Sequence, residues 1–298
     1  EVDSDLVTVL LSDGGGSFYR RSTELNPNFR LRREPDVLSV EALTERIAAI
    51  APAASAARGS GSSLAKLLRL KRLLHPRTET IALHQSDWIL GKLTGCYGIS
   101  DWNNCLKLGY DPRLERWPDW IDQLDLDPVA LPRVVAPGSL VGQLSAEAAD
   151  ATGLPAGLEV IAGTTDSTAA VIAAGARQIG EAVTSLGSTL VVKVLAPAAI
   201  NVSEYGVYSH RYGDLWLVGG ASNSGGAVLR TLFSDERIRQ LTASLRPDRP
   251  TGLDYYPLPA PGERFPVNDP DLPPRLEPRP GSDGLFFQGI LEGIARIE

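Results

Sequence analysis

Two kinds of apolar pattern alternate along this chain, and together they predict an α/β fold. Short β-branched runs predict strands at residues 7–11, 140–144, 158–162, 206–211 and 215–218, and on both sides of residues 187–189. Apolar residues at helical spacing predict helices at residues 39–50, 64–74, 85–93, 146–152, 168–176, 223–233 and 285–298. Ser39, Ser63 and Ser145 are predicted N-caps, and Gly95 and Gly153 are predicted helix stops.

The stretch from residue 158 to residue 195 carries the densest pattern. An apolar run breaks at Gly163-Thr164-Thr165-Asp166-Ser167, and a helix of small residues follows. Asp166 therefore lies at the carboxyl end of a predicted strand, where ligands of α/β sheets gather. A carboxylate there can accept a hydroxyl proton, while an N-cap role explains the same residue. Thr164 and Thr165 can hold sugar hydroxyls or satisfy backbone groups.

Small residues form two candidate phosphate sites. The predicted hairpin turn Gly187-Ser188-Thr189 offers amides and hydroxyls to an anion, although a plain turn needs the same residues. Gly225 lies near the start of a predicted helix, where exposed amides favour negative charge. A tight contact between helix and sheet is the alternative explanation for that glycine.

Composition narrows the class of protein. The 298 residues carry 43% hydrophobic residues and a net charge of −7, which disfavours nucleic acid or an anionic membrane as the main partner. No apolar run approaches the ~20 residues that span a bilayer. Two cysteines are too few for a disulfide scaffold, which favours a reducing intracellular compartment. The three histidines have no metal-ligand spacing. Residues 251–280 are rich in proline, but their aromatic residues predict an ordered excursion rather than a linker.

Three stretches together resemble the FGGY carbohydrate kinases, and above all their xylulose-kinase-like D-ribulose kinase branch in cyanobacteria and plants. They are GTTDSTAA, GEAVTSLGST and GGASNSGG, and the resemblance runs from about Ser62 to Glu298. It implies a two-domain, actin-like (ribonuclease H-like) fold and transfer of the ATP γ-phosphate to a small sugar, such as D-ribulose or D-xylulose. Asp166 matches the catalytic base, and Mg²⁺ is implied by the chemistry. The expected compartment is the cytoplasm or the plastid.

The resemblance also assigns the rest of the site. Leu93-Thr94-Gly95 and the pair Ser100 and Asp101 match a segment that lies close to the sugar in the family, although helix capping explains Ser100 and Asp101 equally well. The hairpin at Gly187 and the turn at Gly225 match the nucleotide side. We expect residues 1–178 to belong to the sugar-binding domain and residues 179–298 to the nucleotide-binding domain. A cleft is expected between Asp166 and Gly187.

Two family motifs are absent from the sequence. Neither the opening Asp-x-Gly-Thr turn nor the C-terminal Gly-rich segment is present, and the chain contains no methionine. We therefore expect a kinase truncated at both ends. The alternatives are a non-catalytic, sugar-binding relic of the same fold and, in a third class, an actin-like ATPase without a sugar substrate. The sequence does not predict an oligomeric state.

Overall fold

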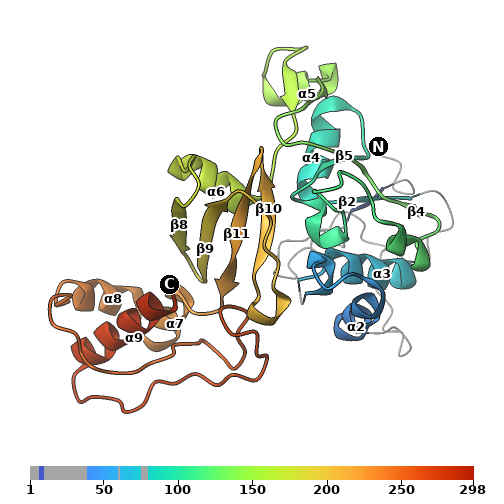
Figure 1. The fold of residues 1–298 in the computed structure, drawn as a ribbon. Coiled ribbons are helices and arrows are strands. Elements are labelled where there is room, and N and C mark those ends of the chain that lie inside the picture. The colour runs from blue at the N-terminus through green and yellow to red at the C-terminus, as the bar shows by residue number, and fades with distance from the viewer. Residues whose placement is uncertain (1–6, 10–38, 60, 75–79) are drawn as a thin grey trace. The chain divides into compact units, whose positions relative to one another are not determined.

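The computed structural model of the protein describes residues 7–9, 39–59, 61–74 and 80–298 (Figure 1). The chain divides into two compact units, Glu1–Asp166 and Ser167–Glu298. The division falls after Asp166, whereas the predicted domain boundary lay at Gln178. The reason is packing: the helix that starts at Asp166 buries Val171 against strands of the second unit. The role predicted for each domain stays a prediction.

The first unit combines helices with small sheets. Its helices are α2 (Val40–Ile50), α3 (Ser63–Leu74), α4 (Gln85–Thr94) and α5 (Ala146–Thr152), with 3-10 turns at Ala56–Arg58, Cys105–Leu108 and Asp119–Gln123. Its strands are β1 (Val7–Val9), β2 (Thr80–Leu83), β3 (Ile99–Asp101), β4 (Val129–Ala130), β5 (Arg133–Val135), β6 (Leu140–Gln143) and β7 (Glu159–Ile161). Strands β1, β2 and β4 form a parallel sheet, as do β3 and β5, while β6 and β7 are antiparallel.

Local capping sets most helix ends in the first unit. The side chains of Ser39 and Ser145 accept hydrogen bonds from the first turns of α2 and α5, as predicted. Gly95 ends α4 with a φ of 76°, a left-handed conformation that glycine adopts without a steric cost. The predicted cap of α3 was wrong by one residue, because Ser62 rather than Ser63 accepts from the Ala65 amide, at 3.1 Å. Residues 10 and 11 of the first predicted strand lie outside the described residues.

The core of the first unit forms where α2 and α3 bury their apolar faces. Leu43 and Ile47 of α2 and Leu64 and Leu67 of α3 are fully buried. Burying side chains of this size contributes roughly 1.5–3 kcal/mol each. Trp120 closes the same cluster from the 3-10 turn that contains it. The periodicity read from the sequence therefore identifies the packed faces.

The second unit contains a four-stranded antiparallel sheet. The strands, in the order β10-β11-β9-β8, are β8 (Ala182–Leu186), β9 (Leu190–Ala196), β10 (Tyr208–Tyr212) and β11 (Leu215–Ser222). The helices are α6 (Asp166–Ala174), α7 (Gly226–Leu232), α8 (Asp235–Thr242) and α9 (Asp283–Ile297), and a 3-10 turn spans Ser203–Tyr205. Figure 1 shows α6 near one end of the strands of this sheet and α7, α8 and α9 grouped near the other end. The predicted hairpin between β10 and β11 is confirmed.

Side-chain alternation along β9 gives the sheet of the second unit two apolar faces. Leu190 packs with Val228 of α7 and Ile290 of α9, whereas Leu195 packs with Val171 of α6. Odd and even positions of one strand therefore serve two different clusters. Tyr255, from the Pro-rich segment, is 2% exposed in the α9 cluster, so the predicted ordered excursion is confirmed. No helix in the described part of the chain is long and apolar enough to cross a membrane.

Candidate functional site

Asp166 is the first residue of α6 and follows β7 after a four-residue connection, close to the predicted position. Its carboxylate is exposed, whereas the Thr168 side chain on the same turn is 2% exposed. The positive end of a helix dipole favours a carboxylate in this first turn. The location suits a proton acceptor and is also a good place for an acidic residue in a helix.

Thr164 is linked to the other predicted sugar segment. Its side-chain oxygen Oγ1 accepts a hydrogen bond of 3.0 Å from Nδ2 of Asn103. Asn103 lies two residues after Asp101 and is 3% exposed. The structure thus links Thr164 to the residue two positions after Asp101, inside the first unit. Asn103 was not identified from the sequence as the partner of Thr164.

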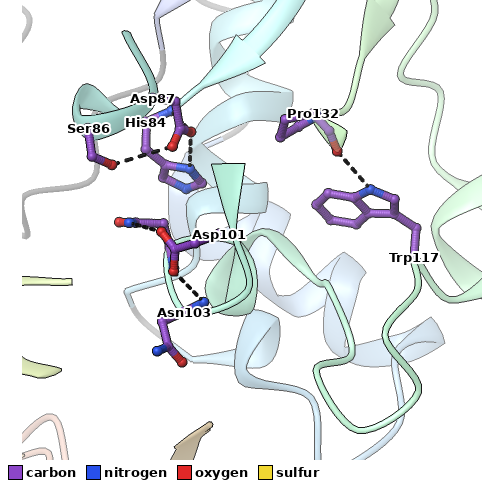
Figure 2. Close-up of polar contacts among 8 residues, drawn as sticks. His84, Ser86, Asp87, Asp101, Asn103, Trp117 and Pro132 are labelled. Atoms are coloured by element: carbon purple, nitrogen blue, oxygen red, sulfur yellow. Dashed lines mark hydrogen bonds and ion pairs between the residues drawn. The ribbon is translucent and has the colours of Figure 1, made fainter. Parts of the chain in front are cut away.

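Asp101 organises the turn after β3 (Figure 2). One carboxylate oxygen accepts from the backbone amides of Asn103 and Asn104, and the other accepts from the Asn104 side chain. Burial raises the pKa of the Asp101 carboxyl, and these hydrogen bonds oppose the rise. Ser100 is 1% exposed. Asp101 therefore holds the turn after β3 and does not cap a helix, because the N-cap of the next 3-10 turn is Asn104, and sugar binding by Ser100 and Asp101 stays a prediction.

A buried His–Asp pair lies in the same unit. The His84 amide donates to Oδ2 of Asp87 at 2.7 Å, and the ring nitrogen Nδ1 lies 3.0 Å from the same oxygen (Figure 2). Both side chains are 3% exposed. The His84–Asp87 pair starts α4, because Asp87 caps its own first turn.

The two cysteines of the first unit, Cys96 and Cys105, are both free thiols. Burial raises the pKa of the Cys105 thiol, and the charge of the nearby Asp87 adds to the rise.

The two predicted phosphate segments lie against each other in the second unit. The amides of Gly226 and Ala227 donate to the carbonyl oxygens of Gly187 and Ser188, at 2.8 and 3.2 Å. A Cβ atom at Gly225, whose φ is 154°, would lie 2.7 Å from the Ser188 carbonyl oxygen. Gly225 is therefore needed for close backbone contact. Two amides at the start of α7 therefore already have backbone acceptors, and phosphate binding at Gly187–Thr189 and Gly225 stays a prediction.

The Ser222–Gly225 turn is held by a buried carboxylate. Glu263 is 2% exposed and accepts from the hydroxyls of Ser222 and Tyr256 and from the backbone amides of Asn223 and Arg264. The Asn223 side chain donates to the Gly262 carbonyl oxygen at 2.9 Å. The Pro-rich segment thereby positions the turn that packs on the candidate phosphate hairpin. Nothing in the local sequence around Glu263 identified this role.

A polar cluster occupies the α6 face of the same sheet. Lys193, in β9, is 5% exposed, and its Nζ lies 3.1 Å from Oγ of Ser167 and 3.1 Å from Nδ1 of His210. The His210 ring contacts Tyr208, with 5.3 Å between ring centroids. The apolar pattern of β9 did not predict a role for Lys193. Lys193 is connected to the predicted site through Ser167, which directly follows Asp166 in the sequence.

The described residues contain no group of three or more His, Cys, Asp and Glu side chains that could hold a metal ion. Mg²⁺ usually binds through one or two carboxylates, waters and substrate phosphates rather than an all-protein cage. A magnesium ion held in that way needs no such group of protein side chains.

No family model matches the chain. Solved structures do. A ligand-bound xylulose kinase from Lactobacillus acidophilus superposes with a TM-score of 0.71 at 17% identity, and a xylulose kinase from Rhodospirillum rubrum with 0.69 at 21%. A Plasmodium falciparum glycerol kinase solved with ADP superposes with 0.63 at 16%. Each match covers 87% of this chain and 56% of the other.

These likenesses show the fold. The chain has the mixed α/β, actin-like architecture of the sugar kinases, so the predicted fold class is confirmed. The chain spans a little over half the length of the kinases it matches. At such identities the superpositions carry no residue roles, and the site rests on the contacts described above.

Proposed function

We propose that this chain supplies the sugar-binding and phosphate-binding core of an ATP-dependent carbohydrate kinase that acts on a ketopentose, D-ribulose or D-xylulose. One observation carries the proposal. The chain has the fold of the sugar kinases, and in it the exposed residue Asp166 begins α6. Thr164, two residues before Asp166, is hydrogen-bonded to Asn103 in the predicted sugar segment. The placement unites the proton acceptor and the predicted sugar contacts in one local region.

The proposed mechanism assigns simple tasks to these groups. Phosphoryl transfer needs positioning, neutralisation of phosphate charge and a group that takes the hydroxyl proton. Asp166 orients the acceptor hydroxyl and takes its proton late in the transfer. Thr164 and Thr165 hold neighbouring sugar hydroxyls. The hydroxyls of Ser188, which is exposed, and Thr189, which is partly buried, contact phosphate oxygens. Mg²⁺, bound through the phosphates of ATP, supplies the neutralising charge.

The test is a panel of sugars with ATP and Mg²⁺. ADP release is followed in the presence of D-ribulose, D-xylulose and glycerol, and binding of each sugar and of ATP is measured separately by calorimetry. The proposal expects ADP release that depends on a ketopentose. Sugar binding without nucleotide binding would support a non-catalytic relic instead. ATP hydrolysis that no sugar changes would support an actin-like ATPase.

A further inference from the structure

Lys193 is an unusual residue in its surroundings. It lies in β9, on the face that α6 covers, and its side chain is 5% exposed. Leu195, two residues along the same strand and on the same face, is an ordinary packing residue of the α6 cluster. Burial of an ammonium group costs several kcal/mol unless hydrogen bonds offset it. If position 193 only had to fill space in the core, methionine or leucine would do so equally well.

The arrangement of the strands lets the Lys193 side chain reach His210 as well as Ser167. Lys193 in β9 pairs with Gly219 in the neighbouring strand β11, and Gly219 pairs on its other side with Tyr208 in β10. Because Gly219 has no side chain, the side chains of Lys193 and His210 can meet across β11, at 3.1 Å. A Cβ atom at Gly219 would collide with the Val192 carbonyl oxygen.

The second contact of Lys193 ties the sheet to α6. A lysine ammonium only donates hydrogen bonds, so the hydroxyl oxygen of Ser167 accepts, at 3.1 Å. Ser167 is the second residue of α6, and Asp166 is the first. The apolar contact of α6 in this cluster comes from Val171, in the middle of the helix, and Ala176 joins the cluster just after the helix ends. The Lys193–Ser167 contact therefore attaches the first turn of α6 to the sheet, ahead of the apolar contact made by Val171.

We propose that Lys193 is a positioning residue for Asp166. By donating to Ser167, it fixes the first turn of α6 on the centre of the sheet and thereby fixes the carboxylate that begins the turn. The inference rests on the proposed function, because it assigns Lys193 to the same phosphoryl transfer. A buried ionic side chain seldom adds stability, because replacing it with an apolar residue is often neutral or stabilising. A need to hold the start of α6 in one position explains the lysine better.

The experiment replaces Lys193 with methionine, which matches its length but cannot donate. Lys92→Met, at an exposed lysine on α4, is the matched control. A second pair, Ser167→Ala and Ser167→Thr, removes or keeps the accepting hydroxyl without touching the strand. Each variant of the full chain is compared with the wild type by hydrogen exchange of peptides covering residues 164–171 and by kcat and KM for the sugar.

We expect Lys193→Met and Ser167→Ala to lose exchange protection in the first turn of α6, with protection of α9 unchanged. We expect kcat to fall by up to about 10²-fold, the loss typical of a displaced catalytic group, with KM for the sugar little changed. Ser167→Thr and Lys92→Met should behave as the wild type. Thermal unfolding shows whether Lys193→Met is folded. If it is not, the comparison of Ser167→Ala with Ser167→Thr tests whether the Lys193–Ser167 hydrogen bond orders the first turn of α6.

Unchanged protection at residues 164–171 in both Lys193→Met and Ser167→Ala would overturn the inference. So would lost protection with a kcat equal to that of Lys92→Met. A wild-type chain that phosphorylates no sugar overturns the proposed function and the catalytic part of this inference. In that case the exchange data still decide whether Lys193 orders the turn, so the two failures are distinguishable.

Discussion

Removal of the Glu263 carboxylate tests whether the Pro-rich segment holds the candidate phosphate hairpin in place. In the folded chain, Oε1 accepts from the amides of Asn223 and Arg264 at 2.7 and 2.8 Å. Oε2 accepts from the hydroxyls of Ser222 and Tyr256 at 2.6 and 3.0 Å. Glu263→Ala deletes the acceptor for all of these donors at once.

The magnitude follows from which donors can find another partner. The hydroxyls of Ser222 and Tyr256 can rotate, whereas the two amides are fixed by the backbone. Each buried donor left without an acceptor costs about 1–3 kcal/mol. Water that enters the vacated space recovers part of this cost, so we expect Glu263→Ala to destabilise the second unit by about 2–4 kcal/mol.

Glu263→Gln gives an intermediate case. Its carboxamide oxygen can accept from the two amides, while its NH₂ group faces the hydroxyls of Ser222 and Tyr256, which can turn to accept. The hydrogen bonds lose their charge assistance but keep their partners, so we expect a loss of about 1 kcal/mol. Glu236→Ala, at an exposed residue of α8, is the matched control and should change stability by less than about 0.5 kcal/mol.

The assay is hydrogen exchange of peptides covering β11 and residues 222–226, because the two units can unfold separately and a single melting temperature would mix them. The free energy of opening should fall in the order control, Gln and Ala. ATP binding, measured by calorimetry, should weaken in the same order, since the turn supports the hairpin. An alanine variant as well protected as the control would refute the reasoning.

Three further predictions concern the same chain. Asp166→Asn should lower kcat by about 10²–10⁴-fold while stability changes by no more than about 1 kcal/mol, the contribution of a carboxylate in the first turn of a helix; an Asn variant with near-normal turnover would make Asp166 a helix residue only. Gly225→Ala should destabilise the second unit by about 1–3 kcal/mol, measured by urea unfolding, because the new Cβ lies 2.7 Å from the Ser188 carbonyl oxygen. Burial, aided by the charge of Glu263, raises the pKa of Tyr256, so the folded state resists its ionisation. Stability should therefore be intact below the unfolded tyrosine pKa of about 10 and fall as the pH rises above it, and Tyr256→Phe should show a smaller fall over this range.

The local features of this protein were predicted correctly where their cause is local. Helix caps at Ser39 and Ser145 and the stop at Gly95 depend on residues within about one turn, so the sequence contains their whole explanation. The same holds for the break between β7 and α6 that leaves Asp166 at a helix start. The cap of α3 failed by one position because adjacent serines carry the same capping signal.

The sequence by itself thus determined most of the helices, their apolar faces and the position of Asp166, because each depends on propensity and periodicity over a few residues. It did not predict the short strands β2, β3, β4 and β5 or the helix α8. Only the tertiary structure decided which distant polar groups meet. Asn103 reaches Thr164 across 61 positions, and Lys193 reaches Ser167 across 26. Contacts of this kind depend on strand register and on how a helix lies on a sheet, and no local pattern encodes either of them. The same holds for Glu263, which reaches Ser222 across 41 positions and supports the turn beside Gly225.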